Sequence, residues 1–212
     1  MKTPKIDRLK VLDTALSLLE TEGIEGLTMR KLADALQIKA ASLYWHFDNK
    51  QTLIEGMADR IVSEVAINFE FKNNWKEDIK RLSYDLRNVF LRHRDGARVF
   101  AGTYVISENV LRINNTFISA IMQSGTSAQL ASKITMTLLY FILGCCIEQQ
   151  SVMLIEKEEL ANKREAFEQL VQDKFPQTWQ AREVLFADDF TYRFDFGLEH
   201  LILGFQHQIN GS

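Results

Sequence analysis

A short aromatic segment and an arginine upstream of it carry the side chains best suited to contact another molecule. The segment SLYWHF, residues 42–47, places two aromatic rings and a histidine between a turn-like stretch and a polar one. Arg30 precedes it. An arginine can donate two parallel hydrogen bonds to O6 and N7 of guanine, and ring edges can meet thymine methyl groups. These residue types therefore favour contacts with base edges and phosphates.

The spacing within this segment separates a buried face from an exposed one. Leu43 and Phe47 are four residues apart, so they share one face of a helix over residues 40–47 and are expected to pack against the preceding helices. A helix that enters the major groove must keep other side chains exposed. The side chains directed away from the packed face are those of Ala40, Ala41, Tyr44 and Trp45.

The elements around this segment predict a helix-turn-helix. An apolar stripe predicts a first helix over residues 6–22, ended by Gly23. Thr28 is a suitable N-cap for a second helix over residues 29–36, and a short turn separates it from residues 40–47. A connecting helix over residues 50–67 follows, capped by Asp48 or Asn49. Two short helices across a tight turn are typical of DNA-binding proteins.

The rest of the chain predicts further helices. Amphipathic or apolar patterns run over residues 75–93, 127–155 and 190–208, interrupted near residues 95–96 and 124–126. A charged stretch precedes Pro176. The last helix carries Gly197 and Gly204, a spacing that allows close approach of another helix or packing inside one subunit. Because every one of these patterns is helical, the predicted fold class is all-α.

Composition restricts the class of protein. The chain has 212 residues, 46% of them hydrophobic, and a formal net charge of -3, so an overall basic coat is excluded. Residues 26–50 nevertheless carry four basic and two acidic side chains, which places local positive charge on the helix-turn-helix. The two cysteines are adjacent and ill-placed for a disulfide. We expect a cytoplasmic protein without a membrane span.

The ordered motif resembles the DNA-binding domain of the TetR family of bacterial repressors. The resemblance is carried by GLTMRKLA (residues 26–33) and SLYWHFDNKQTL (residues 42–53), and more weakly by HRDGARVFAGT and LGCCIEQQ further on. It implies a three-helix DNA-binding domain over residues 1–48, and a larger helical ligand-binding and dimerisation domain over residues 49–212. The positions that it assigns to DNA are Thr28, Arg30, Ala40, Ala41, Tyr44, Trp45, His46 and Lys50.

The same resemblance locates an effector pocket. Tetracycline-binding members of the family hold a magnesium–drug chelate with a histidine and a glutamate; here Phe100 replaces the histidine, while Glu148 remains. A phenyl ring cannot bind a hard cation, so we expect no metal and no cofactor, and instead a small apolar or aromatic effector. The matching pocket positions are Glu64, Leu82, Leu86, Phe100, Thr103, Tyr104, Val105 and Glu148.

The resemblance implies a ligand-responsive repressor. Its homodimer is expected to bind a palindromic operator in double-stranded DNA. Three alternatives stay open. The pocket residues could simply fill a core, and the chain could bind DNA without an effector as an architectural protein. An enzyme using His93 and Cys145 is the third, but no phosphate-binding glycine loop and no HExxH or CxxC metal pattern is present. We therefore expect no enzymatic activity.

Overall fold

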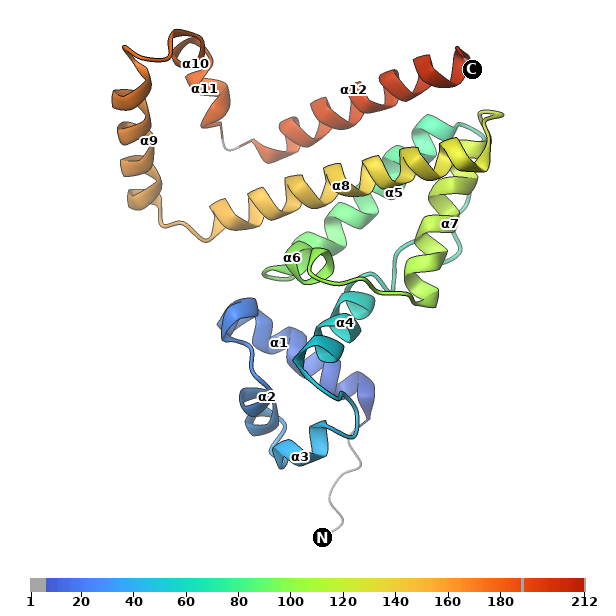
Figure 1. The fold of residues 1–212 in the computed structure, drawn as a ribbon, viewed down its shortest axis with the longest axis vertical. Coiled ribbons are helices and arrows are strands. Elements are labelled where there is room, and N and C mark those ends of the chain that lie inside the picture. Colours follow the sequence, from blue (N-terminus) through green and yellow to red (C-terminus); the bar gives the residue numbers. More distant parts are fainter. Residues whose placement is uncertain (1–6, 188, 212) are drawn as a thin grey trace.

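The computed structural model describes residues 7–187 and 189–211, and Figure 1 shows how they are arranged. Within this part of the chain the regular structure is entirely helical, as the sequence predicted. Ile6, where the first predicted helix begins, lies outside the described residues. The N-terminal helices are α1 (Arg8–Gly26), α2 (Met29–Ala35) and α3 (Ala40–Leu43), and the connecting helix α4 (Lys50–Ile61) follows them.

Side-chain caps fix where α2 and α4 begin. The hydroxyl of Thr28 accepts a hydrogen bond from the Lys31 amide at 3.2 Å, which confirms Thr28 as the N-cap of α2. Of the two candidates for α4, the structure selects Asn49. Its side chain accepts from the Thr52 amide at 3.0 Å, and the Thr52 hydroxyl accepts from the Asn49 amide, which completes a capping box. These caps set the position of the SLYWHF segment (residues 42–47), the recognition segment, between the two helices.

Helix α1 bends at Gly23 before it ends. The backbone there is left-handed (φ 66°), and one further helical turn reaches Gly26, where the sequence predicted the helix to stop at Gly23. Glycine adopts this conformation without the steric penalty of a side chain. The bend frees the Ile24 amide from the helical hydrogen-bond pattern, and it donates instead to the Asp95 carboxylate at 3.0 Å.

Two predicted helices are shorter than expected. Helix α3 ends at Leu43, where the sequence predicted residue 47, because the His46 and Phe47 amides both donate to the Leu43 carbonyl and tighten the chain into a turn. Helix α4 ends at Ile61, where the sequence predicted residue 67. The backbone leaves the helical conformation at Val62 (φ -92°, ψ 3°), and the Ser63 and Val65 amides donate to carbonyls three residues back, so the chain continues as turns. Positive φ angles at Ala66 and Asn68 (58° and 53°) lie within these turns.

The C-terminal domain packs around a central apolar helix (Figure 1). Helix α8 contacts α5, α7 and α12, and Leu138, Ile142 and Cys146 on it are completely buried. Among the described residues it is the one helix long and apolar enough to cross a membrane, but this packing makes it a core helix. The helices of this core are α5 (Trp75–Leu91), α6 (Gly96–Ala101), α7 (Glu108–Met122), α8 (Ala128–Met153) and α12 (Phe190–Asn210).

The predicted breaks and the glycines of the last helix have structural causes. Asp95 (φ 58°) and Gly125 (φ 86°) are left-handed, which confirms the interruptions before α6 and before α8. A Cβ atom on Gly197 would lie 2.5 Å from the Phe141 ring, so this glycine serves packing between α12 and α8 of one chain. A Cβ atom on Gly204 would meet nothing within 4 Å.

The charged stretch before Pro176 forms the first part of a projecting arm. Figure 1 shows α9 (Lys157–Val171), α10 (Pro176–Gln180) and α11 (Arg182–Leu185) beyond the ends of α8 and α12. These three helices mainly contact one another. Several apolar side chains of this arm are exposed, namely Leu170, Phe175, Val184 and Leu185.

Candidate DNA-binding surface and effector cavity

The SLYWHF segment is split between core and surface, as its spacing predicted. Leu43 and Phe47 are 0% and 2% exposed, whereas Tyr44 and Trp45 are 50% and 90% exposed. Large aromatic side chains so exposed beside a helix-turn-helix are available to a partner. The other exposed residues predicted to contact DNA are Thr28, Arg30, Ala40 and Ala41.

Arg8 supports this surface, although no sequence pattern indicated a role for it. Its guanidinium lies 4.4 Å from the centroid of the Phe47 ring and donates to the His46 carbonyl at 3.2 Å. The partly buried His46 therefore has its backbone fixed from α1. A basic residue in the first turn of a helix carries no sequence signal for such a tertiary contact. Arg8 positions the turn that carries Trp45.

Lys50 lies at the N-terminus of α4 but is turned toward α1. Its ammonium group donates to the Ile24 carbonyl at 3.1 Å, and the side chain is partly buried. The peptide groups of Ile24 thus have a partner on each side, Lys50 at the carbonyl and Asp95 at the amide. The bend of α1 is consequently the place where the DNA-binding domain contacts both α4 and the C-terminal domain.

The C-terminal domain holds this bend through a buried carboxylate. Asp95 is 3% exposed, and its two oxygens accept from the Ile24 amide at 3.0 Å and from Arg98 at 3.1 Å. Arg98 also pairs with Glu25 on α1, and this hydrogen bond from Arg98 lowers the pKa of the Glu25 carboxyl. We name the contacts of Asp95 and Arg98 with Ile24 and Glu25 the α1–α6 junction. It joins the first turn of α6 to the DNA-binding domain.

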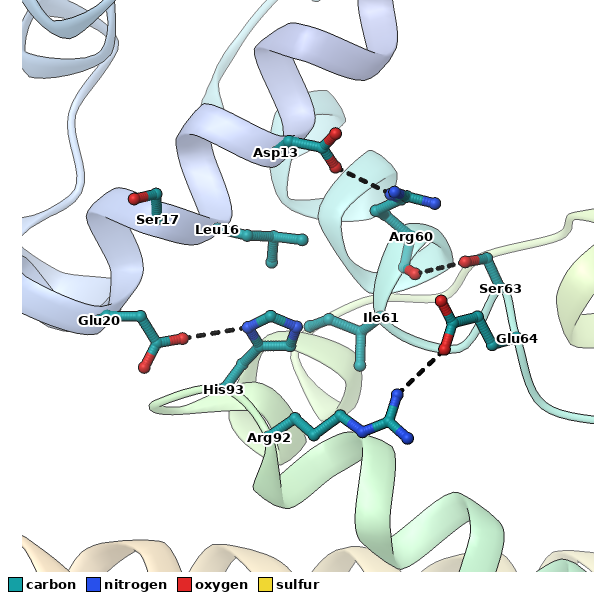
Figure 2. Close-up of a pocket in the computed structure, with 10 residues that line it drawn as sticks. All are labelled: Asp13, Leu16, Ser17, Glu20, Arg60, Ile61, Ser63, Glu64, Arg92 and His93. Carbon is teal, nitrogen blue, oxygen red and sulfur yellow. Dashed lines mark hydrogen bonds and ion pairs between the residues drawn. The ribbon is translucent and has the colours of Figure 1, made fainter.

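A polar cleft lies beside this junction. Figure 2 shows side chains of α1, of α4 and the turn after it, and of the end of α5 around a space of about 450 Å³. Each of its charged side chains has a side-chain partner at 2.9–3.0 Å, so the cleft offers no unpartnered charge to a ligand. The ion pairs are Asp13–Arg60 and Glu64–Arg92, and Glu20 forms a hydrogen bond with the His93 ring.

A larger, more apolar cavity lies at the other end of α6. It has a volume of about 520 Å³ and is bounded by α7, α8 and the segment that follows α6. This size and lining are usual for small-molecule sites. Half of the predicted pocket residues line it, namely Phe100, Thr103, Tyr104 and Val105. Asn114, Leu139 and Tyr140 also line it and were not predicted.

The other four predicted pocket residues lie elsewhere. Leu82 and Leu86 are on the buried face of α5 and belong to the hydrophobic core. Glu64 lines the polar cleft of Figure 2 and pairs with Arg92. Glu148 pairs with Arg193 on α12 at 3.0 Å. The structure therefore assigns two of these residues to packing contacts and two to ion pairs between helices.

Two family models match the chain. The model described as bacterial regulatory proteins, tetR family, matches residues 11–57. The model described as tetracyclin repressor-like, C-terminal domain, matches residues 70–209, which is most of the remaining chain.

The chain belongs to the TetR family.

Individual TetR-family proteins align over nearly the whole length. Tetracycline repressor protein class E of Escherichia coli is 32% identical over 202 residues, which cover 94% of this chain and 90% of that repressor. A crystal structure of a possible TetR family transcriptional regulator from Streptomyces coelicolor A3(2) is 34% identical, has a TM-score of 0.86, and aligns with 95% of this chain and 99% of its own. The family's function as transcriptional repressors therefore applies to this chain.

A second solved structure contains a ligand. The TetR family protein ActR of Streptomyces coelicolor, in complex with actinorhodin, is 26% identical with a TM-score of 0.85, and the alignment covers 96% of this chain and 98% of that one. In this TetR-family chain the described residues contain no group of three or more His, Cys, Asp or Glu side chains that could hold a metal ion. Phe100 lines the apolar cavity, and Glu148 pairs with Arg193.

Proposed function

We propose that this TetR-family repressor is a cytoplasmic homodimer that binds a palindromic operator and is released by a small apolar or aromatic effector other than magnesium–tetracycline. One observation carries the proposal. Helix α6 contacts the DNA-binding domain through Asp95 at its N-terminal end, and its last residues, Phe100 and Ala101, line the apolar cavity. The two proposed domains are residues 1–48, which bind DNA, and residues 49–212, which bind the effector and form the dimer. One short helix thus connects the proposed effector cavity with the DNA-binding domain.

The proposed dimer forms through the outer faces of α8 and α12. Both helices expose large apolar side chains, and a Cβ atom on Gly144 or Gly204 would meet nothing within 4 Å, so another helix can approach closely. An isologous interface of this kind places two recognition helices about 34–36 Å apart, one turn of B-DNA. The exposed side chains are Tyr140 on α8, and Tyr192, Phe196 and Leu203 on α12.

Release needs only a difference in effector affinity between two arrangements of the dimer. A ligand that presses on the end of α6 shifts the α1–α6 junction, and α4, which packs against α6, moves with it. An effector that favours the mis-spaced arrangement by about 3 kcal/mol weakens operator binding more than about 100-fold. No unfolding is required.

The enzyme alternative receives no support from the residues that it would need. Burial raises the pKa of Cys146 to about 12, and burial also raises the pKa of Cys145, so neither thiol is primed as a nucleophile. His93 pairs with Glu20 in the polar cleft, whose lining does not include either cysteine. An effector-independent DNA-binding protein remains the runner-up, and an effector that changes operator affinity would exclude it.

Replacing Arg30 by alanine is expected to weaken operator binding by about 1–3 kcal/mol and to relax preference at one base pair per half-site. The reason is that Arg30 is exposed on α2 and can bond two guanine atoms at once. The measurement is fluorescence anisotropy of purified protein with duplexes from its own upstream intergenic DNA, against a scrambled duplex at the same salt concentration. An operator preference identical to that of the parent protein would remove Arg30 from this role.

Replacing Lys50 by alanine separates two roles for its ammonium group. If Lys50 contacts phosphate, affinity for operator and scrambled duplex falls alike, and the slope of log K against log salt decreases by about 0.9 per lost contact. If it serves only the Ile24 carbonyl seen in the structure, the slope is unchanged and stability falls by about 1 kcal/mol. We expect the slope to decrease; salt titrations with Lys39→Ala as the comparison variant measure it.

A further inference from the structure

The effector cavity has a wall without formal charge. Among the residues that line it there is no Asp, Glu, Lys, Arg or His. Its walls are formed mainly by aliphatic and aromatic side chains, including Val110, Leu139 and Leu143. An ionised group placed in such surroundings loses hydration and gains no ionic partner, so the cavity disfavours a charged ligand. An apolar or aromatic body is favoured.

One half-buried side chain in this wall has unused hydrogen-bonding capacity. Asn114 lies on α7, is half-buried and lines the cavity, and its amide has no hydrogen-bond partner among the described residues. The hydroxyl of Thr103, by contrast, already donates to the Phe100 carbonyl at 2.8 Å. A primary amide can donate two hydrogen bonds and accept others. The hydroxyls of Tyr104 and Tyr140 also line the cavity without a hydrogen-bond partner among the described residues, but these side chains are 92% and 66% exposed. Asn114 is therefore the half-buried polar group in the wall that is free to fix a ligand's orientation.

We propose that the effector is an uncharged aromatic molecule whose carbonyl or hydroxyl edge bonds to Asn114. This inference rests on the proposed function, because it takes the cavity to be the effector site. It adds a selection rule to that function. The ring system is held by apolar contacts, Asn114 selects molecules with a neutral hydrogen-bonding edge, and ionised analogues of the same shape are rejected.

Three probes of nearly equal size test this rule with the full-length protein. They are 2-acetylnaphthalene, which has a neutral carbonyl, 2-ethylnaphthalene, which has no polar edge, and 2-naphthoate, which is an anion. Equilibrium dialysis measures their dissociation constants. We expect the ketone to bind about tenfold more tightly than the ethyl compound, the effect of one hydrogen bond to a half-buried amide. We expect the carboxylate to bind more weakly than both.

A matched pair of variants assigns the preference to one side chain. In Asn114→Leu the ketone and the ethyl compound should bind equally, because the amide is gone and the apolar wall is kept. Asn115 is the next residue on the same helix, is exposed, and does not line the cavity. Asn115→Leu should keep the tenfold preference. A preference that survives Asn114→Leu, or disappears in Asn115→Leu, would overturn the role of Asn114.

Operator binding, measured by anisotropy with and without each probe, separates this inference from the proposed function. Specific operator binding with no binding of the neutral probes, or with 2-naphthoate binding as tightly as the ketone, overturns the ligand class but leaves the repressor. The expected ranking without any change in operator affinity supports the ligand class and overturns release through this cavity. The expected ranking with release of the operator supports both.

Discussion

Replacing Phe47 by alanine is expected to lower the free energy of unfolding of the N-terminal domain by about 3–5 kcal/mol and to abolish operator binding. Phe47 is 2% exposed, and a Cβ atom on Gly56 of α4 would lie 2.9 Å from its ring, so the packing around it is tight. The ring also lies against the Arg8 guanidinium. Its loss leaves a cavity under the recognition segment and releases the turn that holds Trp45. Urea unfolding and anisotropy with operator DNA measure the two effects.

Trp45→Ala is the control for this prediction. Trp45 is two residues away but 90% exposed, so its replacement should change stability by less than about 0.5 kcal/mol. Operator affinity should nevertheless fall, because an exposed ring at the predicted phosphate contact is removed. If Phe47→Ala retained normal stability, or if Trp45→Ala unfolded the domain, the division of this segment into a buried and an exposed face would be wrong.

The second large effect is expected at the α1–α6 junction. Replacing Asp95 by glycine should lower the free energy of unfolding by about 2–3 kcal/mol, because it leaves the Ile24 amide and Arg98 without their buried carboxylate partner. Glycine adopts the left-handed backbone of this position readily, so the loss reports mainly the carboxylate. The two domains should then unfold in separate calorimetric transitions.

The same variant tests the route of the effector signal. With the junction broken, the factor by which an effector weakens operator binding should decrease by at least about tenfold, while effector binding to the cavity is retained. Asp95→Asn is the comparison, since its amide oxygen can still accept from Ile24 and only the charge toward Arg98 is lost. Unchanged release in Asp95→Gly would show that α4 alone carries the signal.

Local patterns in the sequence were sufficient to predict most helices. The Thr28 cap, the breaks at Asp95 and Gly125, and the burial of Leu43 with Phe47 depend on residue type and on a spacing of a few residues, and each is confirmed. The early end of α4 at Ile61 was not predictable. The turns that follow it include positive φ angles at Ala66 and Asn68, and alanine gives no signal for that conformation.

The candidate sites were predictable only in part, because they depend on contacts between distant segments. Periodicity indicates that Leu82 is buried, but it cannot tell a core position from a cavity wall, and Leu82 lies in the core. Glu148 and Arg193 are far apart in sequence, and only the fold brings them into an ion pair. The roles of the predicted DNA-contacting and effector-contacting residues remain predictions.

The projecting arm of α9 to α11 bears on how much of the regulator a cell must make. A single folded chain leaves Leu170, Phe175, Val184 and Leu185 in water, and pairing of two chains offers a way to cover such surface. Where the chain concentration is below the dissociation constant of the dimer, the amount of dimer rises with the square of that concentration. The abundance of the chain would then set how sharply operator occupancy responds as the protein is synthesised or diluted by growth.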